Sequence, residues 1–351
     1  MSTIATKVVD SDKIWATLIT NDSYLPGLLT LEFSLRRVGS KYPLVALHTG
    51  SLPPKTLHAL TARGIPTQQV PYLLPGPPSP PSPPPSPPDS QASSPVRASH
   101  PTLTGNTTTT TTTKNGGGND KESGWYANDP RFRACFTKLA VFSLTGYARI
   151  VLLDADMLVR RNMDELFDLP LAAPPTPSHS PLPSSNNNNT EETPGPIFAA
   201  THACLCNPLH FAHYPPSWTP SNCAFTAQHP HPDLAQTTAA PPSSGLGLLN
   251  GGLLCVTPSA RAYSQILAFL ADPRRATPAA LPFADQSLLS IVFEGRWAAL
   301  PYVYNALKTM RWERVHGRIW RDGEVKCVHY ILTPKPWEVK GGTQQKGEGG
   351  M

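Results

Sequence analysis

Two aspartates follow an apolar run near the middle of the chain. Residues 150–153 are branched apolar side chains, and Asp154 and Asp156 come directly after them, separated by Ala155. Such a run predicts a buried strand. Side chains two positions apart on an extended chain point the same way, so the two carboxylates can converge on one point. A divalent cation held against a diphosphate would explain two acids here, because hard cations take carboxylate oxygens; a turn with two solvated acids is the alternative.

A second set of metal-binding residue types lies between residues 202 and 223. Cysteine and histidine are common zinc ligands, but the spacing here does not match a common zinc finger. Two interpretations stay open: a zinc site that structures an interaction protein, and a Pro-rich surface loop with partly buried thiols. The six residues are His202, Cys204, Cys206, His210, His213 and Cys223.

The elements that must position the aspartates alternate between strand and helix. Residues 14–20, 44–47 and 68–73 predict strands, while 28–39 and 53–63 have helical periodicity. This alternation is typical of a parallel sheet with crossover helices, and ligands of such sheets bind at the carboxyl ends of the strands. Residues 20–22 and 154–156 both occupy that kind of position.

The second half of the chain continues the pattern. Helices are predicted over 132–144, over 258–270 and from 283 onwards, and strands over 197–200, 248–256 and 325–331. Gly251 and Gly252 allow another group to approach the backbone closely. Lys138 and Asp285 lie on predicted helices and His329 on the last strand. Each has an ordinary structural explanation when taken singly: a solvated lysine, a helix N-terminal charge and a strand histidine.

Proline is concentrated in two parts of the chain. The sequence has 42 prolines in 351 residues, about 12% against a usual level near 5%. Residues 75–123 and 174–196 contain Pro-Ser, Thr and Asn runs that cannot bury enough apolar surface to order themselves. We therefore expect a single domain over residues 1–338 with two disordered insertions, an irregular loop at about 202–244 and a disordered tail at 339–351.

Charge and hydropathy exclude several classes of protein. The net charge of +5 suits a small anionic ligand, but the chain has no basic tract typical of nucleic-acid binding. The N-terminus has no apolar leader, and no apolar run reaches membrane-spanning length. These features predict a cytoplasmic protein whose six cysteines are free thiols.

Four segments of the sequence, taken in order, carry a family resemblance. They are residues 17–24, residues 153–156, residues 249–252 followed by Asp285-Gln286, and His329-Tyr330 followed by Lys335-Pro336-Trp337. In this order they resemble the retaining glycosyltransferases of family 8, which include glycogenin and galactinol synthase. The resemblance covers residues 12–72, 125–171 and 245–338. Each segment alone is a weak signal, whereas all four in the family's order are specific.

The resemblance implies a fold and a set of site residues. The fold is α/β of the GT-A type, a Rossmann-like nucleotide-diphospho-sugar domain with a mixed central sheet flanked by helices. Asp154, Asp156 and His329 would bind a divalent metal, and a mixed carboxylate and imidazole set favours Mn²⁺. The implied donor-binding residues are Leu18, Thr20, Asn21 and Tyr24 at the uracil and ribose, Lys138 and Lys335 at the sugar or diphosphate, and Ala155, Asn250 and Gly252. The implied catalytic residues are Asp285, Gln286 and Lys138.

The implied reaction is metal-dependent, retaining transfer of glucose or galactose from a UDP-sugar to an acceptor hydroxyl, as in galactinol synthase. The expected acceptor is a small polyol or saccharide. Asp285 is the only matched carboxylate for a nucleophile on the far face of the sugar, and we favour attack from the leaving-group side instead. The alternative function is an inactive nucleotide-sugar-binding scaffold whose Pro-rich loops bind SH3-like domains. A second copy of the chain is a further expected partner.

Two positions depart from the family's pattern. Glycogenin glucosylates its own tyrosine a few residues after a pair that resembles Tyr304-Asn305, and Trp312 stands at the corresponding place here. Self-glucosylation at that site is therefore not expected. The family's glycine between the last histidine and the last lysine corresponds to Leu332, in the loop expected to face the diphosphate.

Overall fold

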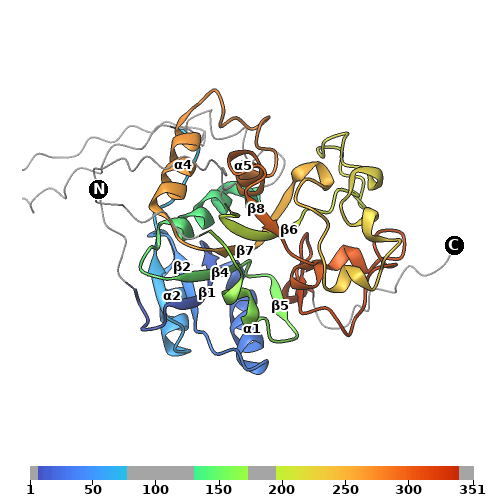
Figure 1. Ribbon diagram of the computed structural model, residues 1–351. Helices are drawn as coiled ribbons and strands as arrows, with labels where there is room; N and C mark the ends of the chain where they lie inside the picture. The colour runs from blue at the N-terminus through green and yellow to red at the C-terminus, as the bar shows by residue number, and fades with distance from the viewer. Residues whose placement is uncertain (1–6, 77–129, 173–194, 340–351) are drawn as a thin grey trace, which may run out of the picture.

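The computed structural model describes residues 7–76, 130–172 and 195–339 (Figure 1). The predicted insertions at 75–123 and 174–196 and the predicted tail at 339–351 lie almost wholly outside the described residues. Within the described ranges we find no helix with the length and hydropathy that a membrane span requires. All six cysteines are described, and all are free thiols, as the sequence predicted.

A seven-stranded mixed sheet lies at the centre of the molecule. Its strands are β1 (Lys13–Ile19), β2 (Leu44–His48), β3 (Thr67–Gln69), β4 (Arg149–Leu153), β6 (Phe198–His202), β7 (Leu249–Val256) and β8 (Trp297–Ala299). The order across the sheet is β3-β2-β1-β4-β7-β6-β8. The first four run parallel, β7 is antiparallel to both of its neighbours, and β8 is parallel to β6. The predicted Rossmann-like α/β fold with a mixed central sheet is confirmed.

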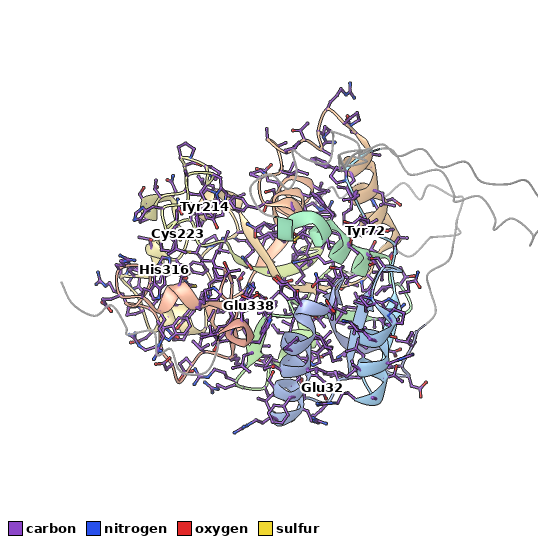
Figure 2. All side chains as sticks on the ribbon, turned by 180° about the vertical axis from the view of Figure 1, so that it is seen from behind. Glu32, Tyr72, Tyr214, Cys223, His316 and Glu338 are labelled. Carbon is purple, nitrogen blue, oxygen red and sulfur yellow. The ribbon has the colours of Figure 1, made fainter. Side chains whose placement is uncertain are left out.

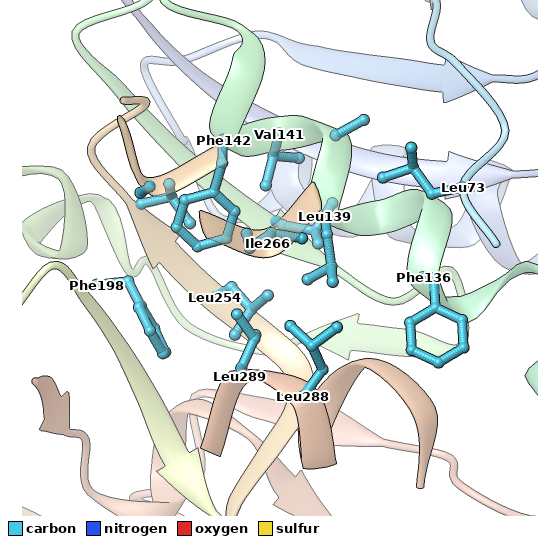
Figure 3. Packing of buried hydrophobic residues seen from close by; sticks show 14 of the residues in the cluster. Leu73, Phe136, Leu139, Val141, Phe142, Phe198, Leu254, Ile266, Leu288 and Leu289 are labelled. Atoms are coloured by element: carbon cyan, nitrogen blue, oxygen red, sulfur yellow. The ribbon is translucent and has the colours of Figure 1, made fainter. Parts of the chain in front are cut away.

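Helices cover both faces of this sheet. Along β1, Ile14 and Ala16 belong to one core cluster and Trp15 to another, because alternate side chains point to opposite faces. One face packs against the 3-10 helix η2 (Pro130–Ser143), α4 (Ala260–Ala271) and α5 (Ala284–Val292). Figure 3 shows Ile266 of α4 and Leu288 of α5 beside Leu254 of β7. The other face is covered by α1 (Leu25–Arg37) and α2 (Pro54–Ala62).

The predicted elements differ from the observed ones in two details. The helix predicted over 132–144 is wound as the 3-10 helix η2 and begins two residues earlier. The strand predicted over 68–73 is only the short β3, and the backbone N–H of Leu73 donates to the Thr137 hydroxyl at 3.2 Å rather than to a neighbouring strand. The segment after β3 therefore leaves the sheet and packs on η2.

A second, three-stranded sheet continues from β4. It contains β5 (Met157–Val159), β10 (Cys327–His329) and β9 (Ala306–Leu307) in the order β5-β10-β9. β5 begins one residue after Asp156 and pairs antiparallel with β10, so that Met157 lies opposite His329. This pairing brings a strand from near the end of the chain to the aspartate pair.

The residues between β6 and β7 form a lobe with the C-terminal segment. Among its described residues, 203–248 contains no α-helix or strand, only short 3-10 turns. It shares a hydrophobic core with residues 302–328, in which Leu205, Phe225, Tyr302, Met310 and Ile319 are buried. Figure 1 shows these two segments, yellow and red, side by side at one end of the large sheet. Besides η2, the described residues contain the 3-10 turns η1 (Asp22–Tyr24), η3 (Asp164–Asp168), η4 (Pro220–Asn222), η5 (Thr226–Gln228), η6 (Leu234–Gln236), η7 (Gly245–Gly247), η8 (Tyr302–Tyr304), η9 (Lys308–Arg311) and η10 (Pro336–Glu338).

Candidate functional site

A cavity of about 1320 Å³ opens at the carboxyl ends of β1 and β4. These strands are parallel neighbours, so the residues that follow them meet at one edge of the sheet. Asn21 accepts a hydrogen bond from the backbone N–H of Ser23 at 3.1 Å and caps the turn η1 after β1. Asp154 follows β4, and its backbone N–H donates to the carbonyl of Gly252 on β7 at 2.9 Å.

The structure brings all the predicted site residues to this one cavity. Segments more than 300 residues apart in the sequence contribute to its lining. The lining includes Leu18, Thr20, Asn21, Tyr24, Lys138, Asp154, Ala155, Asp156, Asn250, Gly252, Asp285, Gln286, His329 and Lys335.

Two carboxylates and one imidazole converge at the floor of the cavity. One donor atom from each of Asp154, Asp156 and His329 lies within 4.8 Å of the other two. His329 Nε2 is 3.2 Å from Asp156 Oδ1 and 3.8 Å from Asp154 Oδ2. Asp156 and His329 are 7% and 4% exposed, so water cannot compensate their polarity fully.

Asn305 fixes which ring nitrogen of His329 faces the carboxylates. The Asn305 side-chain amide donates to Thr201 Oγ1 and Asn250 Oδ1, both at 2.9 Å, so its oxygen must face His329. His329 Nδ1 then donates to that oxygen at 2.9 Å, so Nε2 is the ring nitrogen that faces the carboxylates. A ring nitrogen beside two carboxylate oxygens requires a proton or a metal cation between them. The donor set therefore fits a divalent metal ion.

Two buried lysines compensate the acidic groups. Lys138 Nζ is 2.7 Å from Asp154 Oδ1 and 3.5 Å from Asp285 Oδ2, and Lys335 Nζ contacts Asp156 Oδ2. Burial alone would lower the pKa of Lys138, but Asp154 and Asp285 outweigh it and raise that pKa well above its usual range. Burial alone would raise the pKa of Asp156, but His329 and Lys335 hold it well below its usual range. Lys138 and Asp156 are therefore charged at neutral pH.

Asp285 lies deep in the site, beside the glycine pair of β7. It is 4% exposed, and its Oδ2 atom is buried without a hydrogen-bond partner. Burial raises the pKa of the Asp285 carboxyl to about 6, while Lys138 opposes this shift and Asp154 adds to it. Gln286, the next residue, also lines the cavity from the first turn of α5.

The close approach predicted at the glycine pair is present. A Cβ on Gly252 would lie 2.6 Å from His329 Nδ1, and a Cβ on Gly251 would collide with Asp285 Oδ2. Gly27 of α1 was not predicted as a close approach, yet a Cβ there would meet the Ala155 carbonyl and lie 2.6 Å from the Trp337 ring. Glycine at these positions lets the imidazole, a carboxylate and the aspartate loop press against the backbone.

One wall of the cavity is aromatic and was not predicted from the sequence. Tyr214 and Trp218 of the 203–248 segment pack on Phe283, with centroid distances of 5.1 Å and 4.2 Å, and all three rings line the cavity. The high density of aromatic residues between 211 and 218 is the sequence feature that could have indicated this wall. A predicted loop, however, has no periodicity from which the surface that it covers can be predicted. The predicted irregular loop is thus a wall of the cavity.

Leu332, the residue at the family's glycine position, has φ of 66° and lines the cavity. A left-handed conformation costs a residue with a Cβ about 1–2 kcal/mol and costs glycine little. We expect Leu332→Gly to be more stable to denaturant than Leu332→Ala by about 1 kcal/mol, the reverse of the usual order of the two residues. Both variants lose the leucine side chain, so the difference isolates the backbone. A more stable alanine variant would show that the loop has another conformation in solution.

Asn305 gives a second prediction, because it orients the His329 imidazole and is not itself one of the three candidate metal ligands. We expect Asn305→Ala to weaken Mn²⁺ binding by about 10- to 100-fold in a calorimetric titration. Asn162→Ala is the control: its amide oxygen accepts from the backbone N–H of Asp164 at 2.8 Å and it lies outside the cavity. Equal Mn²⁺ affinity in the Asn305 variant and the wild type would contradict the role assigned to this hydrogen bond.

Comparison with known sequences agrees with the geometry. The family model described as glycosyl transferase family 8 matches residues 230–341. Galactinol synthase 1 of Arabidopsis thaliana is 24% identical over 338 residues, which covers 95% of this chain and 74% of the plant protein. Glycogenin of Neurospora crassa is 22% identical over 343 residues, covering 97% of this chain but 33% of the fungal protein.

Solved glycosyltransferase structures are also similar to this chain. One is the galactosyltransferase LgtC in complex with donor and acceptor sugar analogues, with 14% identity, a TM-score of 0.49, and coverage of 92% of this chain and 89% of that one. Another is the bifunctional glycosyltransferase WbbM, with 12% identity, a TM-score of 0.49, and coverage of 95% and 48%.

Proposed function

We propose that this chain belongs to glycosyltransferase family 8 and is a metal-dependent retaining hexosyltransferase that moves glucose or galactose from a UDP-sugar to an acceptor hydroxyl. The observation that carries the proposal is the convergence of Asp154, Asp156 and His329 within 4.8 Å in a large cavity. Two carboxylates and an imidazole suit Mn²⁺ better than Mg²⁺, which prefers oxygen ligands and retained water. A bound cation would stabilise the negative charge that develops on a departing diphosphate.

The charges around the site support a diphosphate ligand. Among the described residues, Asp154, Asp156 and Asp285 form ion pairs with two lysines, Lys138 and Lys335, so negative charge is in excess when these five groups are ionised. A divalent cation reverses that sign and makes the pocket attractive to an anion. Lys138 and Lys335 line the cavity, and their Nζ atoms can be shared between the carboxylates and a phosphate group.

The residues at the end of β1 and in η1 support a nucleoside. Leu18, Thr20, Asn21 and Tyr24 line the cavity from β1 and η1, next to the aspartate loop. Tyr24 stands edge-on to Trp337 at a centroid distance of 5.8 Å, and this contact holds the tyrosine ring in place. We assign these four residues to the uracil and ribose.

The position of Asp285 favours attack from the leaving-group side. A nucleophile on the far face of the sugar needs an exposed carboxylate. Asp285 is 4% exposed and is buried against Gly251 and Lys138. We therefore propose that Asp285 positions Lys138. Asn250 and Gly252 would shape the sugar pocket, and Gln286 would contact the sugar.

The acceptor is assigned to the aromatic wall. Tyr214, Trp218 and Phe283 offer flat apolar rings on which the C–H faces of a polyol or a saccharide can pack. The plant relatives are galactinol synthases by name, so myo-inositol is the first acceptor to test.

A donor screen tests the proposed function. The purified 351-residue chain is incubated with Mn²⁺ and UDP-glucose or UDP-galactose, and UDP release is measured with and without myo-inositol. We expect one donor to give UDP release that is stimulated by an acceptor and abolished by a chelator. Tight UDP binding without turnover of either donor, over a panel of polyol and saccharide acceptors, would instead favour the inactive scaffold. Absence of UDP binding would contradict both functions.

A further inference from the structure

Four side chains in the lobe form a second cluster of metal-binding donors. Cys204, Cys206, Cys223 and His316 each place one donor atom within 4.8 Å of the others. His316 Nε2 lies 3.4 Å from Cys204 Sγ, 3.3 Å from Cys206 Sγ and 3.4 Å from Cys223 Sγ. Figure 2 shows Cys223 and His316 together in the lobe, on segments of different colour. The four donors share no residue with the aspartate site.

The distances match those around a tetrahedral zinc ion. Zinc bonds of about 2.3 Å to sulfur and about 2.0–2.1 Å to nitrogen put a ligating nitrogen roughly 3.5 Å from each ligating sulfur. The three observed separations of 3.3–3.4 Å are close to this value and nearly equal to each other. One imidazole nitrogen equidistant from three sulfur atoms is the arrangement that a common central ion requires.

The local fold directs each donor inward. Residues two apart on an extended chain point the same way, so Cys204 and Cys206 face the cluster while Leu205 between them is buried in the lobe core. The backbone N–H of Leu205 also donates to Cys223 Sγ at 3.4 Å, a hydrogen bond that stabilises a thiolate. Asn207, which follows with φ of 42°, turns the chain away after the second cysteine.

His316 has the outer-shell partner that a metal-bound histidine needs. Its Nδ1 atom lies 3.0 Å from Nε2 of His229, so Nδ1 can donate there while Nε2 faces the sulfurs. The His316 ring is fully buried and stands edge-on to Phe225 at a centroid distance of 5.5 Å. Packing and hydrogen bonding thus fix the ring in one orientation.

We propose that Cys204, Cys206, Cys223 and His316 bind a structural zinc ion. Four protein ligands fill a tetrahedral shell and leave no open position for a substrate, which is typical of structural sites.

The structure corrects in two ways the set of possible zinc ligands that the sequence offered between residues 202 and 223. Three of its members are no part of the cluster: His202, which bonds the Ala240 carbonyl at 3.0 Å, and His210 and His213. The fourth ligand comes from 93 residues beyond Cys223.

A disulfide bond explains the grouping of these four side chains less well than a zinc ion does. A bond between two of the sulfurs would leave the third, together with the fully buried His316 nitrogen, without a strong partner. All three cysteines are free thiols in the structure. A zinc ion uses all four donors and removes the repulsion that three adjacent thiolates would otherwise have.

The zinc ion would tie together the two segments that form the lobe. Cys204, Cys206 and Cys223 belong to the segment that carries Tyr214 and Trp218, and Cys204 itself lines the cavity. His316 belongs to the C-terminal segment, which also supplies β10. The ion therefore fixes the aromatic wall against the rest of the site. The proposal does not rest on the chain being an active transferase.

Metal content of matched variants tests the proposal. We expect about one zinc ion per chain by elemental analysis of the wild type, and its loss in Cys223→Ser and in His316→Gln. Cys255→Ser is the control, because this cysteine lies on β7 and its sulfur bonds the Leu166 carbonyl at 3.0 Å. Asp156→Ala should lose Mn²⁺ binding but keep zinc. A wild type purified from zinc-supplemented medium with no bound zinc, or a control variant that loses zinc equally, would overturn the proposal.

The wild type alone provides a test should those variants not fold. A thiol reagent applied to the native holoprotein should spare the three cluster cysteines, and a zinc chelator should make them reactive and lower the melting temperature. Zinc, but not Mn²⁺, should restore both properties. Co²⁺ in place of zinc should give the intense visible absorption of tetrahedral thiolate coordination. A Cys204–Cys206 or Cys206–Cys223 disulfide found in freshly purified protein, or a chelator without effect on thiol reactivity, would contradict a zinc site.

Discussion

Replacing Asp156 with alanine is expected to abolish Mn²⁺-dependent UDP binding and to lower UDP-sugar turnover by about 10²- to 10³-fold or more. Asp156 is the most buried of the two acids, lies 3.2 Å from His329 and contacts Lys335. Its removal would take one ligand from the proposed metal site and leave the buried ammonium group of Lys335 without its counter-charge. Calorimetry with UDP in the presence and absence of Mn²⁺ measures the first effect.

The loss of the counter-charge requires a control of its own. Breaking a buried ion pair costs about 3–5 kcal/mol of folding stability, and this could by itself lower UDP binding and turnover. The double variant Asp156→Asn with Lys335→Met is uncharged at this pair and should recover most of the melting temperature without recovering Mn²⁺ binding. Asp168→Asn, which alters an exposed carboxylate on the surface, should change neither property. If UDP affinity in the presence of Mn²⁺ were the same in Asp156→Ala as in the wild type, the aspartate pair would not be a metal site.

The parts of the site that the sequence predicted are those carried by short segments with a regular backbone. Asp154 and Asp156 follow a strand, and residues two apart on a strand face one point, so their convergence needed no knowledge of the fold. The parallel pairing of β1 and β4 then placed Asn21 beside them, as the alternation of strands and helices predicted. His329 was placed by family resemblance, and the antiparallel pairing of β10 with β5 explains how it reaches the acids.

The contacts that the sequence did not predict join segments far apart in the chain. Asn305 reaches His329 across 24 residues and Thr201 across 104, through a small sheet whose strands have only two or three residues. His316 joins Cys223 across 93 residues, and local spacing carries no trace of such a ligand. Neither residue has a periodic pattern around it, because both lie in a lobe of turns where the backbone follows no fixed repeat.

Gly252→Ala is expected to have an effect on the site comparable to the loss of a ligand, although it adds a single methyl group. The new Cβ would lie 2.6 Å from His329 Nδ1 and 2.9 Å from Asn250 Oδ1, closer than real Cβ contacts allow. His329 cannot retreat easily, because it is 4% exposed and Nδ1 is bonded to Asn305. A shift of about 1 Å in a positioned group can cost about 10²-fold in rate. We expect a loss of that size in turnover, together with weaker Mn²⁺ binding.

Gly323→Ala is the matched control for this variant. Gly323 is exposed, its φ is not left-handed, and a Cβ there meets no atom within 4 Å. The same chemical change should therefore leave Mn²⁺ binding, turnover and melting temperature unaltered. A Gly252→Ala protein that binds Mn²⁺ as the wild type does would mean that the imidazole does not press on this glycine in solution. In that case the orientation of His329 by Asn305, and with it the three-ligand metal site, would have to be abandoned, because the same contact geometry underlies both.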